Sequence, residues 1–297
     1  MAVIPVFNVE PEVQSTRTLR HVLHVIVRDP LALASSIVIM VFILIAIFAY
    51  QVAPFPLEGS GKTNVPNSLL APGPGHPLGA DRLGRDVLSR LIMGARPALV
   101  VPMGVVLFAV LLGAPLGAIA GYKGGWIDEV IMRITDLFLA FPSLLLAMAI
   151  ATALGRGLQN AAIALVVSWW PWYTRLVRGV TISLRERYFI EAAQATGVRD
   201  SVIILRHILP NTISPILVQA TVDLGTVILA MGGLAFLGLG TQPPAADWGL
   251  MVSEGRDFIL KQWWISTFPG LSIFVVVLAF NLLGDTLRDI FDPRQYK

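Results

Sequence analysis

Long stretches without charged residues dominate the pattern of polar and hydrophobic positions along this chain. Five of them contain no Asp, Glu, Lys or Arg, and each approaches or exceeds the roughly 20 residues that an α-helix needs to cross a membrane. The pattern therefore predicts membrane-spanning helices. The first stretch is too long for the apolar part of a signal peptide, which has about 7 to 15 residues. The five stretches are residues 30–57, 97–122, 137–155, 157–174 and 262–284.

A sixth stretch, residues 208–246, is interrupted by a single acidic residue, Asp223. It is long enough for a helix and a flanking loop, and we expect the helix near residues 213–236. The Gly-Arg-Gly sequence at 155–157 separates the third and fourth stretches, and a turn this short predicts two antiparallel helices. The expected fold is an all-α membrane protein with six transmembrane helices.

The composition agrees with this class of protein and excludes several others. Hydrophobic residues make up 55% of the chain and charged residues 14%, whereas a soluble domain has about 25% charged residues. The formal net charge of +3 is not concentrated in one stretch, so nucleic acid is not an expected partner. The long uncharged stretches make membrane lipid the expected surroundings. The absence of cysteine excludes disulfides, thiolate zinc sites and cysteine nucleophiles.

The distribution of Lys and Arg predicts the orientation in the membrane. Six crossings place both termini on one side, where tails and loops hold 14 basic residues against 8 on the other side. Because cytoplasmic loops carry the excess of basic residues, both termini are predicted to be cytoplasmic. The expected organisation is a cytoplasmic tail (1–29), a transmembrane domain (30–286) with an external segment (54–96) and a cytoplasmic loop (175–211), and a cytoplasmic tail (287–297).

The external segment contains an amphipathic pattern. In residues 81–96, Leu, Val and Ile fall on one side of a helix and charged residues on the other. Asp81 is a suitable N-cap for this helix, and Gly94 is a suitable end. We expect a surface helix that covers the bundle.

The sequence contains no arrangement of residues that is typical of an enzyme site. Residues 61–63 contain the Gly-Lys-Thr sequence of a phosphate-binding loop but have Pro56 where its first glycine is needed, and Gly79 and Gly84 have the glycine spacing but are followed by Arg-Asp. Its four histidines lack the spacing of two metal ligands on a helix, and no nucleophile has an evident base. We therefore expect no catalytic residue, no metal site and no cofactor in this chain.

Asp223 is the only acidic residue inside a predicted span. A carboxylate at the bilayer centre costs about 2.5 to 3.5 kcal/mol on insertion scales unless it faces protein or water. Two roles are equally compatible with the sequence. Asp223 lines a translocation or proton path, or it is a structural carboxylate that is hydrogen-bonded to a neighbouring helix.

The cytoplasmic loop has a helical pattern of its own. Residues 188–196 consist mostly of helix formers, and Gly197 can supply a left-handed C-terminal cap. Residues 198–209 can form a second helix that stops at Pro210, since proline ends a helix. The pattern predicts a short helical hairpin that stands off the membrane.

The first helix of this hairpin has features of a docking element. Ala192 and Ala193 are small and permit a close approach of a partner. Glu191 is available to pair with a basic group. These residues favour docking over a mere linker.

The residues of this hairpin resemble a known motif. Glu191-Ala192-Ala193, then Gly197, and then His-Ile-Leu-Pro ending at Pro210 resemble the EAA loop of bacterial ABC importer permeases. The histidine at the start of this last group resembles the form of the motif found in the peptide and nickel branch of that family. Residues 78–96, 131–147, 236–251 and 268–293 also resemble the C-type permease subunit of dipeptide and oligopeptide importers.

The resemblance implies a type I ABC importer permease in the bacterial inner membrane. It implies that this chain and a second homologous permease form the translocation path, and that two cytoplasmic subunits bind ATP and Mg. It also implies an extracytoplasmic solute-binding protein that delivers the substrate, with a peptide as the expected substrate. Transport of nickel or another small solute is the alternative within the family, and a proton-coupled secondary transporter is the alternative outside it.

The resemblance also assigns roles to residues of this chain. Glu191, Ala192, Ala193 and Gly197 are implied to form the coupling helix and its turn, seated on an ATPase subunit, and Pro210 to end the hairpin. Closure of the ATPase pair then drives a largely rigid-body switch of the bundle. In the predicted topology the helix over 81–96 faces outside, so its residues Asp86 and Arg90 are expected to contact the binding protein.

Overall fold

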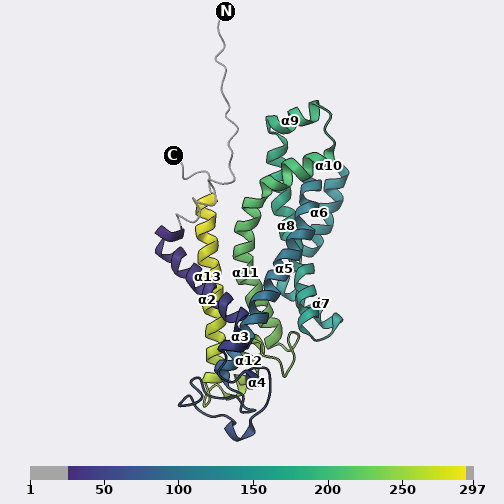
Figure 1. Cartoon of the computed structure of the whole chain (residues 1–297). Helices are drawn as coiled ribbons and strands as arrows, with labels where there is room; N and C mark the ends of the chain where they lie inside the picture. Colours follow the sequence, from purple (N-terminus) through teal and green to yellow (C-terminus); the bar gives the residue numbers. More distant parts are fainter. Residues whose placement is uncertain (1–25, 292–297) are drawn as a thin grey trace, which may run out of the picture.

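The computed structural model describes residues 26–291, and within them the chain is helical without strands. The predicted tails, 1–29 and 287–297, lie mostly outside these residues. The longer elements form one elongated bundle (Figure 1). In chain order the α-helices are α2 (Pro30–Ile47), α3 (Ala49–Val52), α4 (Pro56–Gly59), α5 (Val87–Lys123), α6 (Gly125–Leu139), α7 (Ser143–Leu154), α8 (Leu158–Arg185), α9 (Tyr188–Ala195), α10 (Asp200–Ile203), α11 (Ile213–Phe236), α12 (Trp248–Gly255) and α13 (Trp264–Phe291).

The bundle has two different ends. One end, which we call the hairpin end, carries α9 and α10 together with the start of α2 and the finish of α13 (Figure 1). The opposite end, which we call the loop end, carries α4, α12 and the long connections over residues 53–86 and 237–263. Both ends of the described chain therefore lie on the same side of the bundle as α9.

Several predicted spans agree with the observed helices. The helix expected near 213–236 is α11, with the same bounds, and the first stretch forms α2 followed by the short α3. Asp29 caps α2, because its Oδ1 accepts a hydrogen bond from Leu31 N at 2.9 Å, and Pro30 occupies the first turn, where no N–H is needed. The predicted turn at 155–157 separates α7 from α8.

The number of membrane crossings is supported only in part. By length and composition, four helical stretches can span a membrane: α2, α5, residues 200–236 and α13. The helices α6 and α7 are bent by 85° at a short break and make a fifth if they form one span. Helix α8 is not among them, because polar residues begin it and a Trp-Tyr cluster lies further along it. The sixth crossing stays a prediction.

The amphipathic helix expected over residues 81–96 is wrong in both of its limits. Helix α5 begins at Val87, with Asp86 as its N-cap, and it continues through Gly94 to Lys123. Asp81 cannot cap it, since its Oδ1 accepts the backbone N–H groups of Leu83 and Arg85 within the preceding loop. Gly94 does not end the helix but lets it pack closely on another element, because a Cβ at Gly94 would lie 2.9 Å from Trp248 Cδ1.

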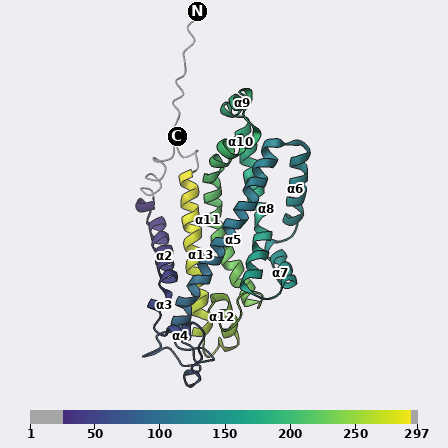
Figure 2. The same cartoon turned by 45° about the vertical axis from the view of Figure 1, so that its right-hand side comes forward.

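Helices α5 and α8 share the most extensive contact of any helix pair in the described bundle (Figure 2). Gly113, Gly117 and Gly121 are spaced four residues apart along α5, and all three face the backbone of α8. A Cβ at Gly121 would lie 2.8 Å from the carbonyl oxygen of Arg178, which is closer than real Cβ contacts. Small residues at this spacing allow two backbones to approach closely, as they do in transmembrane helix pairs.

The hydrophobic core divides into three main clusters along the bundle. Toward the loop end, residues of α2, α12 and α13 pack on the first half of α5, with Trp248 and Trp264 among them. In the middle, residues of α5, α7, α8 and α11 pack around Tyr173 and Leu165. At the hairpin end, α9 and the turns after it pack on α5 and α8. Helix α5 contributes to all three clusters and thus links the two ends.

Candidate functional site

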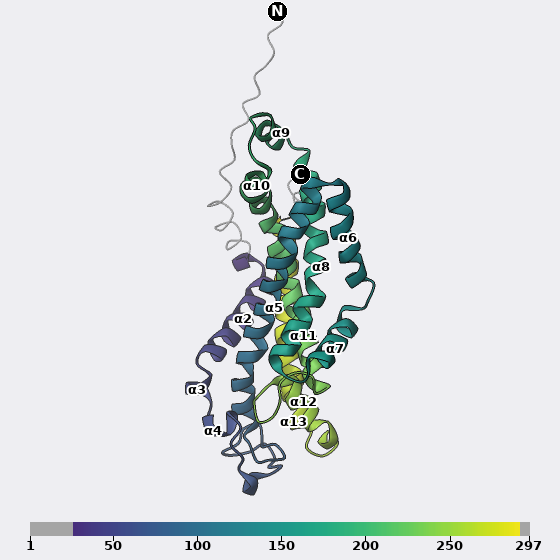
Figure 3. The ribbon, with the colours of Figure 1, turned by 90° about the vertical axis from the view of Figure 1, so that its right-hand side faces the viewer.

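The hairpin projects beyond the end of the bundle (Figure 3). After α8 ends at Arg185, the chain turns into α9 (Tyr188–Ala195), which presents one face to the surroundings. Tyr188 is 89% exposed, and Glu191, Ala192 and Gly197 are exposed as well. This combination of an aromatic ring, a carboxylate and small residues offers a surface on which another protein can seat.

The predicted turn after α9 is confirmed at Gly197. Its φ of +76° lies in the left-handed region, which glycine adopts at little cost. The amide of Gly197 donates to Gln194 O at 2.9 Å, and the amide of Val198 donates to Ala193 O at 3.1 Å. These two bonds form a Schellman motif, which satisfies the last carbonyl groups of the helix.

The inner side of the hairpin is held by a hydrophobic cluster. Ile190 of α9 is fully buried, as are Ile203 and Ile208 from the returning segment. Ala193, in contrast to the exposed Ala192, is half-buried and packs against this cluster. The two adjacent alanines thus have different surroundings, one facing outward and one inward.

The predicted second helix of the hairpin, 198–209, differs from the structure at its end. Helix α10 (Asp200–Ile203) passes into a π-helical turn (Ile204–Ile208), then into a 3-10 turn (Leu209–Thr212), and then into α11. Pro210 therefore marks a change of helix type and not a stop. The segment stays helical because it packs into the hairpin cluster through the buried Ile208, although Pro210 has no N–H to donate. Asn211 Nδ2 donates to His207 O at 2.6 Å beside it.

Side chains from the hairpin also bind the last turn of α5. The Tyr122 hydroxyl donates to Asp200 Oδ1 at 3.0 Å and accepts from Gln194 Nε2 at 3.1 Å. Lys123 Nζ forms an ion pair with Asp200 Oδ2. The sequence did not predict this contact, because the partners are more than 70 residues apart along the chain.

The loop end contains a cluster of four buried charged residues. Asp81 Oδ2 accepts from Arg85 Nε at 2.7 Å and from Arg90 Nη1 at 2.6 Å. Glu254 Oε2, from α12, accepts from Arg85 Nη2 at 3.0 Å and from Arg90 Nη1 at 2.7 Å. The charges balance, and the cluster fastens the loop before α5 to α12. We call these four residues the ionic cluster.

Asp86 and Arg90 do not lie on the surface that the sequence predicted for them. Their exposed fractions are 0% and 1%. Asp86 Oδ1 lies 2.9 Å from His76 Nδ1, and Asp86 Oδ2 accepts from the amide of Ser89 at 2.7 Å. Direct contact of Asp86 and Arg90 with a binding protein does not agree with this burial. Their observed role is to fix the start of α5.

A second carboxylate at the loop end, Asp247, caps α12. Its Oδ1 accepts from Leu250 N at 3.1 Å, and its Oδ2 accepts from the hydroxyl of Thr241 at 2.9 Å. Burial raises the pKa of Asp247 above its ordinary value, although these hydrogen bonds act in the opposite direction. Asp247 thus orders the connection between α11 and α12.

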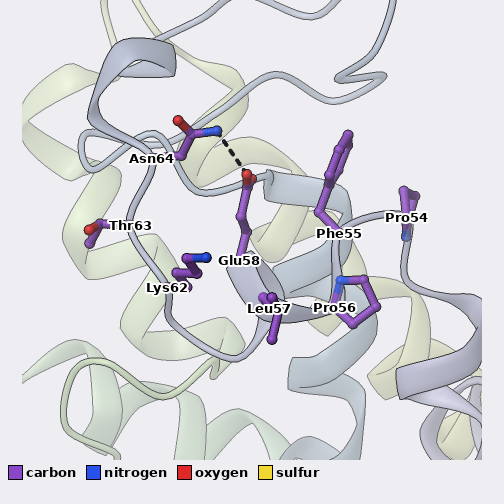
Figure 4. Close-up of a pocket in the computed structure, with 8 residues that line it drawn as sticks. All are labelled: Pro54, Phe55, Pro56, Leu57, Glu58, Lys62, Thr63 and Asn64. Carbon is purple, nitrogen blue, oxygen red and sulfur yellow. Dashed lines mark hydrogen bonds between the residues drawn. The ribbon is translucent and has the colours of Figure 1, made fainter.

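A pocket of about 430 Å³ lies beside α4 at the loop end (Figure 4). Pro54, Phe55 and Leu57 contribute apolar surface, and Glu58 is its only acidic group. Both oxygens of Glu58 are engaged, because Oε1 accepts from Asn64 Nδ2 at 3.0 Å and Oε2 accepts from the amide of Asp86 at 2.9 Å. The pocket therefore has no free carboxylate to bind a cationic ligand. Among residues 26–291, no three His, Asp or Glu side chains meet in a way that could hold a metal ion.

Asp223 lies inside the bundle, on the face of α11 that contacts other helices of this chain. It is 8% exposed, and its Oδ1 accepts a hydrogen bond from Gln219 Nε2 at 3.0 Å. The Tyr173 hydroxyl of α8 lies near the carboxylate but does not reach hydrogen-bond geometry with it. The hydrogen bond to a neighbouring helix that the structural alternative supposed is not formed, since Gln219 lies on α11 itself. The burial of Asp223 among the helices of this chain is the observation that favours a structural role.

We expect Asp223→Asn to assemble normally and to leave transport unchanged. The amide keeps an oxygen that can accept from Gln219, and it removes a charge that is costly to bury. The measurement is solute uptake in membrane vesicles at equal amounts of inserted protein. If uptake were lost while assembly remained normal, Asp223 would instead belong to the translocation path.

Comparison with known proteins identifies the kind of protein that this fold and hairpin define. Residues 113–297 match the family described as "binding-protein-dependent transport system inner membrane component". Residues 18–72 match the N-terminal transmembrane domain of oligopeptide transport permease C. The chain is thus an inner-membrane permease component, and it belongs to the family of binding-protein-dependent transport system inner membrane components.

Several relatives match over most of their length. The chain is 49% identical, over 268 residues, to the dipeptide transport system permease protein DppC of Alkalihalophilus pseudofirmus, covering 90% of this chain and 87% of the relative. It is 43% identical, over 271 residues, to the glutathione transport system permease protein GsiD of Escherichia coli, covering 90% and 88%. It is 39% identical to the probable D,D-dipeptide transport system permease protein DdpC of Escherichia coli, with the same coverage.

A solved structure shows the same fold. The chain is similar to a chain in an inward-facing structure of the MetNI methionine ABC transporter, with a TM-score of 0.54 and 20% sequence identity. The similarity covers 68% of this chain and 97% of that one. The two chains therefore share the same helical fold.

Proposed function

We propose that this chain is the permease subunit of an ATP-driven importer of dipeptides or other short peptides, in which it forms half of the translocation path. The observation that carries the proposal is the exposed helix α9, held by a buried hairpin core and closed by Gly197. A peptide is favoured over nickel or another solute, since the relatives described above are named for dipeptide and glutathione transport.

The proposal requires partner subunits. A second homologous permease would complete the path, and two subunits that bind ATP and Mg would supply the driving force. An extracytoplasmic solute-binding protein would deliver the peptide. The family description, an inner membrane component of a binding-protein-dependent system, supports this assembly.

The two ends of the bundle then face opposite sides of the inner membrane. The hairpin end lies in the cytoplasm, where Glu191, Ala192 and Gly197 would seat in a groove of one ATPase. The loop end lies outside, where the binding protein docks on exposed parts of residues 53–86 and 237–263. In this arrangement α8 also crosses the membrane, which gives six crossings and cytoplasmic termini.

We expect Glu191→Lys to remove the ATPase subunits from the complex while the permease still inserts. Glu191 lies on the exposed face of α9, so reversing its charge changes the docking surface and leaves the hairpin core intact. The measurement is purification of the tagged chain from its native membranes in mild detergent, followed by mass spectrometry of the co-purifying subunits.

Glu129→Lys is the matched control. It makes the same change of charge on α6, where Glu129 is exposed and forms only an exposed ion pair with Arg133, so the ATPases should remain bound. Retention of the ATPases by Glu191→Lys would contradict the docking assignment. Purification of the unaltered chain without any second permease or ATPase would contradict the proposed function itself.

A further inference from the structure

Helix α5 reaches from the loop end to the hairpin. Helices α8 and α11 are joined to the hairpin by the chain itself, whereas α5 contacts it only through side chains. Helix α5 has 37 residues, which corresponds to a length of about 55 Å, and it runs along most of the bundle (Figure 2). Its first turns hold Arg90 of the ionic cluster, and its last turn holds Tyr122 and Lys123. Helix α5 is continuous between these two sites, although it contains Pro97, Pro102 and Pro115, and it is therefore the element on which a movement of the hairpin acts.

The hairpin is attached to its neighbours in two different ways. It continues directly into α8 on one side and into α11 on the other. Its attachment to α5 is made by side chains: the hydrogen bonds of Tyr122 with Asp200 and Gln194, the exposed ion pair of Lys123 with Asp200, and apolar packing of Ala114, Ala118 and the buried Tyr122 ring in the hairpin cluster. Replacing the polar residues at this contact can therefore weaken the attachment of the hairpin to α5, while the chain still connects the hairpin to α8 and α11.

We propose that Tyr122, Lys123 and Asp200 form a clamp by which movement of the hairpin is transmitted to α5. The inference rests on the proposed function, in which the ATPases move the hairpin. The three residues are positioning residues, because they lie at the contact between the end of α5 and the hairpin and not on the outward face of α9. Gln194 strengthens the clamp from α9, since its amide donates to the same Tyr122 hydroxyl.

The geometry makes the clamp sensitive to single atoms. The Tyr122 hydroxyl joins α5 to both halves of the hairpin at once, because it donates to Asp200 at the start of α10 and accepts from Gln194 near the end of α9. Tyr122→Phe removes this one oxygen and keeps the ring in the hydrophobic cluster. The substitution thus loosens the link between hairpin and α5 without emptying the core.

The test uses the complete complex, reconstituted in liposomes with its binding protein and with radiolabelled alanylalanine as the probe. For Tyr122→Phe we expect the ATPases to remain bound and to hydrolyse ATP, while uptake per ATP falls about three- to tenfold, the range that corresponds to the loss of hydrogen bonds. Arg133→Gln, which breaks an exposed ion pair on α6, is the control and should leave the ratio unchanged. An unchanged ratio in Tyr122→Phe would overturn the clamp.

Charge reversal separates the clamp from a general loss of stability. Lys123→Asp and Asp200→Lys should each lower uptake per ATP, and the double variant should recover the part of the loss that belongs to the ion pair, which re-forms with reversed polarity, while the hydrogen bond from Tyr122 to Asp200 stays lost. Additive losses in the double variant would contradict the proposal. If the unaltered complex bound no ATPase or took up no dipeptide with ATP, the proposed function would fail, independently of the clamp.

Discussion

Replacing Glu254 with alanine is expected to destabilise the loop end by about 3–5 kcal/mol, the usual cost of breaking a buried ion pair. Glu254 Oε2 accepts from both Arg85 and Arg90, and both guanidinium groups are buried. Without Glu254, Asp81 would be the only anion in the ionic cluster for two buried cations. The measurement is thermal unfolding of the purified complex in detergent, followed by tryptophan fluorescence. The indole N–H groups of Trp248 and Trp264 donate to the backbone carbonyl oxygens of Leu91 and Ala80 in this region, so both rings contribute to the fluorescence signal.

Two further variants define the cause. Asp257→Ala removes a carboxylate three residues further along, whose ion pair with Arg256 is exposed, and it should have a small effect. Arg90→Leu together with Glu254→Leu should recover much of the lost stability, since Arg85 and Asp81 remain as a balanced pair. If Glu254→Ala unfolded at the same temperature as the unaltered protein, the ionic cluster would make no net contribution.

Replacing Gly117 with alanine is expected to destabilise the packing of α5 on α8 by about 1–3 kcal/mol. A Cβ at this position would overlap the carbonyl oxygen of Thr174 and lie 2.9 Å from Arg178 N, and both are backbone atoms that cannot rotate away. The two helices would have to separate along the stripe formed by Gly113, Gly117 and Gly121. The measurement is the amount of folded, monodisperse protein in detergent after heating.

Gly179→Ala is the matched control for this prediction. It makes the same change in α8, where a Cβ would meet no atom within 4 Å. Alanine in a helix is favoured over glycine by about 0.5–1 kcal/mol, so this variant should be as stable as the unaltered protein or slightly more stable. Equal stability of Gly117→Ala and Gly179→Ala would show that the close approach of α5 and α8 is not needed.

The hairpin explains how far sequence reasoning reached at the candidate site. Helix α9 and its left-handed turn at Gly197 were predictable, because helix formers before a glycine cap are local signals. The continuation past Pro210 was not, because whether a proline ends a helix or only changes its type depends on how the next segment of chain packs. Here α11 begins at Ile213, three residues after the proline, and the chain stays helical between them.

The external segment shows the opposite case. The charged residues between 81 and 96 have a helical pattern, which predicts a surface helix. Their shared partner, Glu254, is 169 residues from Arg85 and 164 residues from Arg90 along the chain. A pattern along the chain cannot show that charged side chains meet such distant partners, and it therefore placed Asp86 and Arg90 at the surface.

The sequence by itself determined what depends on local composition and spacing: apolar helices long enough for a membrane, the bounds of α11, the turn before α8, and the helix and turn of the hairpin. The tertiary structure decided which polar groups are buried and what they bind. It placed the ionic cluster inside the loop end, Tyr122 against Asp200, and the glycines of α5 against the backbone of α8. The physical reason is that burial and ion pairing depend on contacts between distant segments, whereas helix formation depends mainly on neighbouring residues.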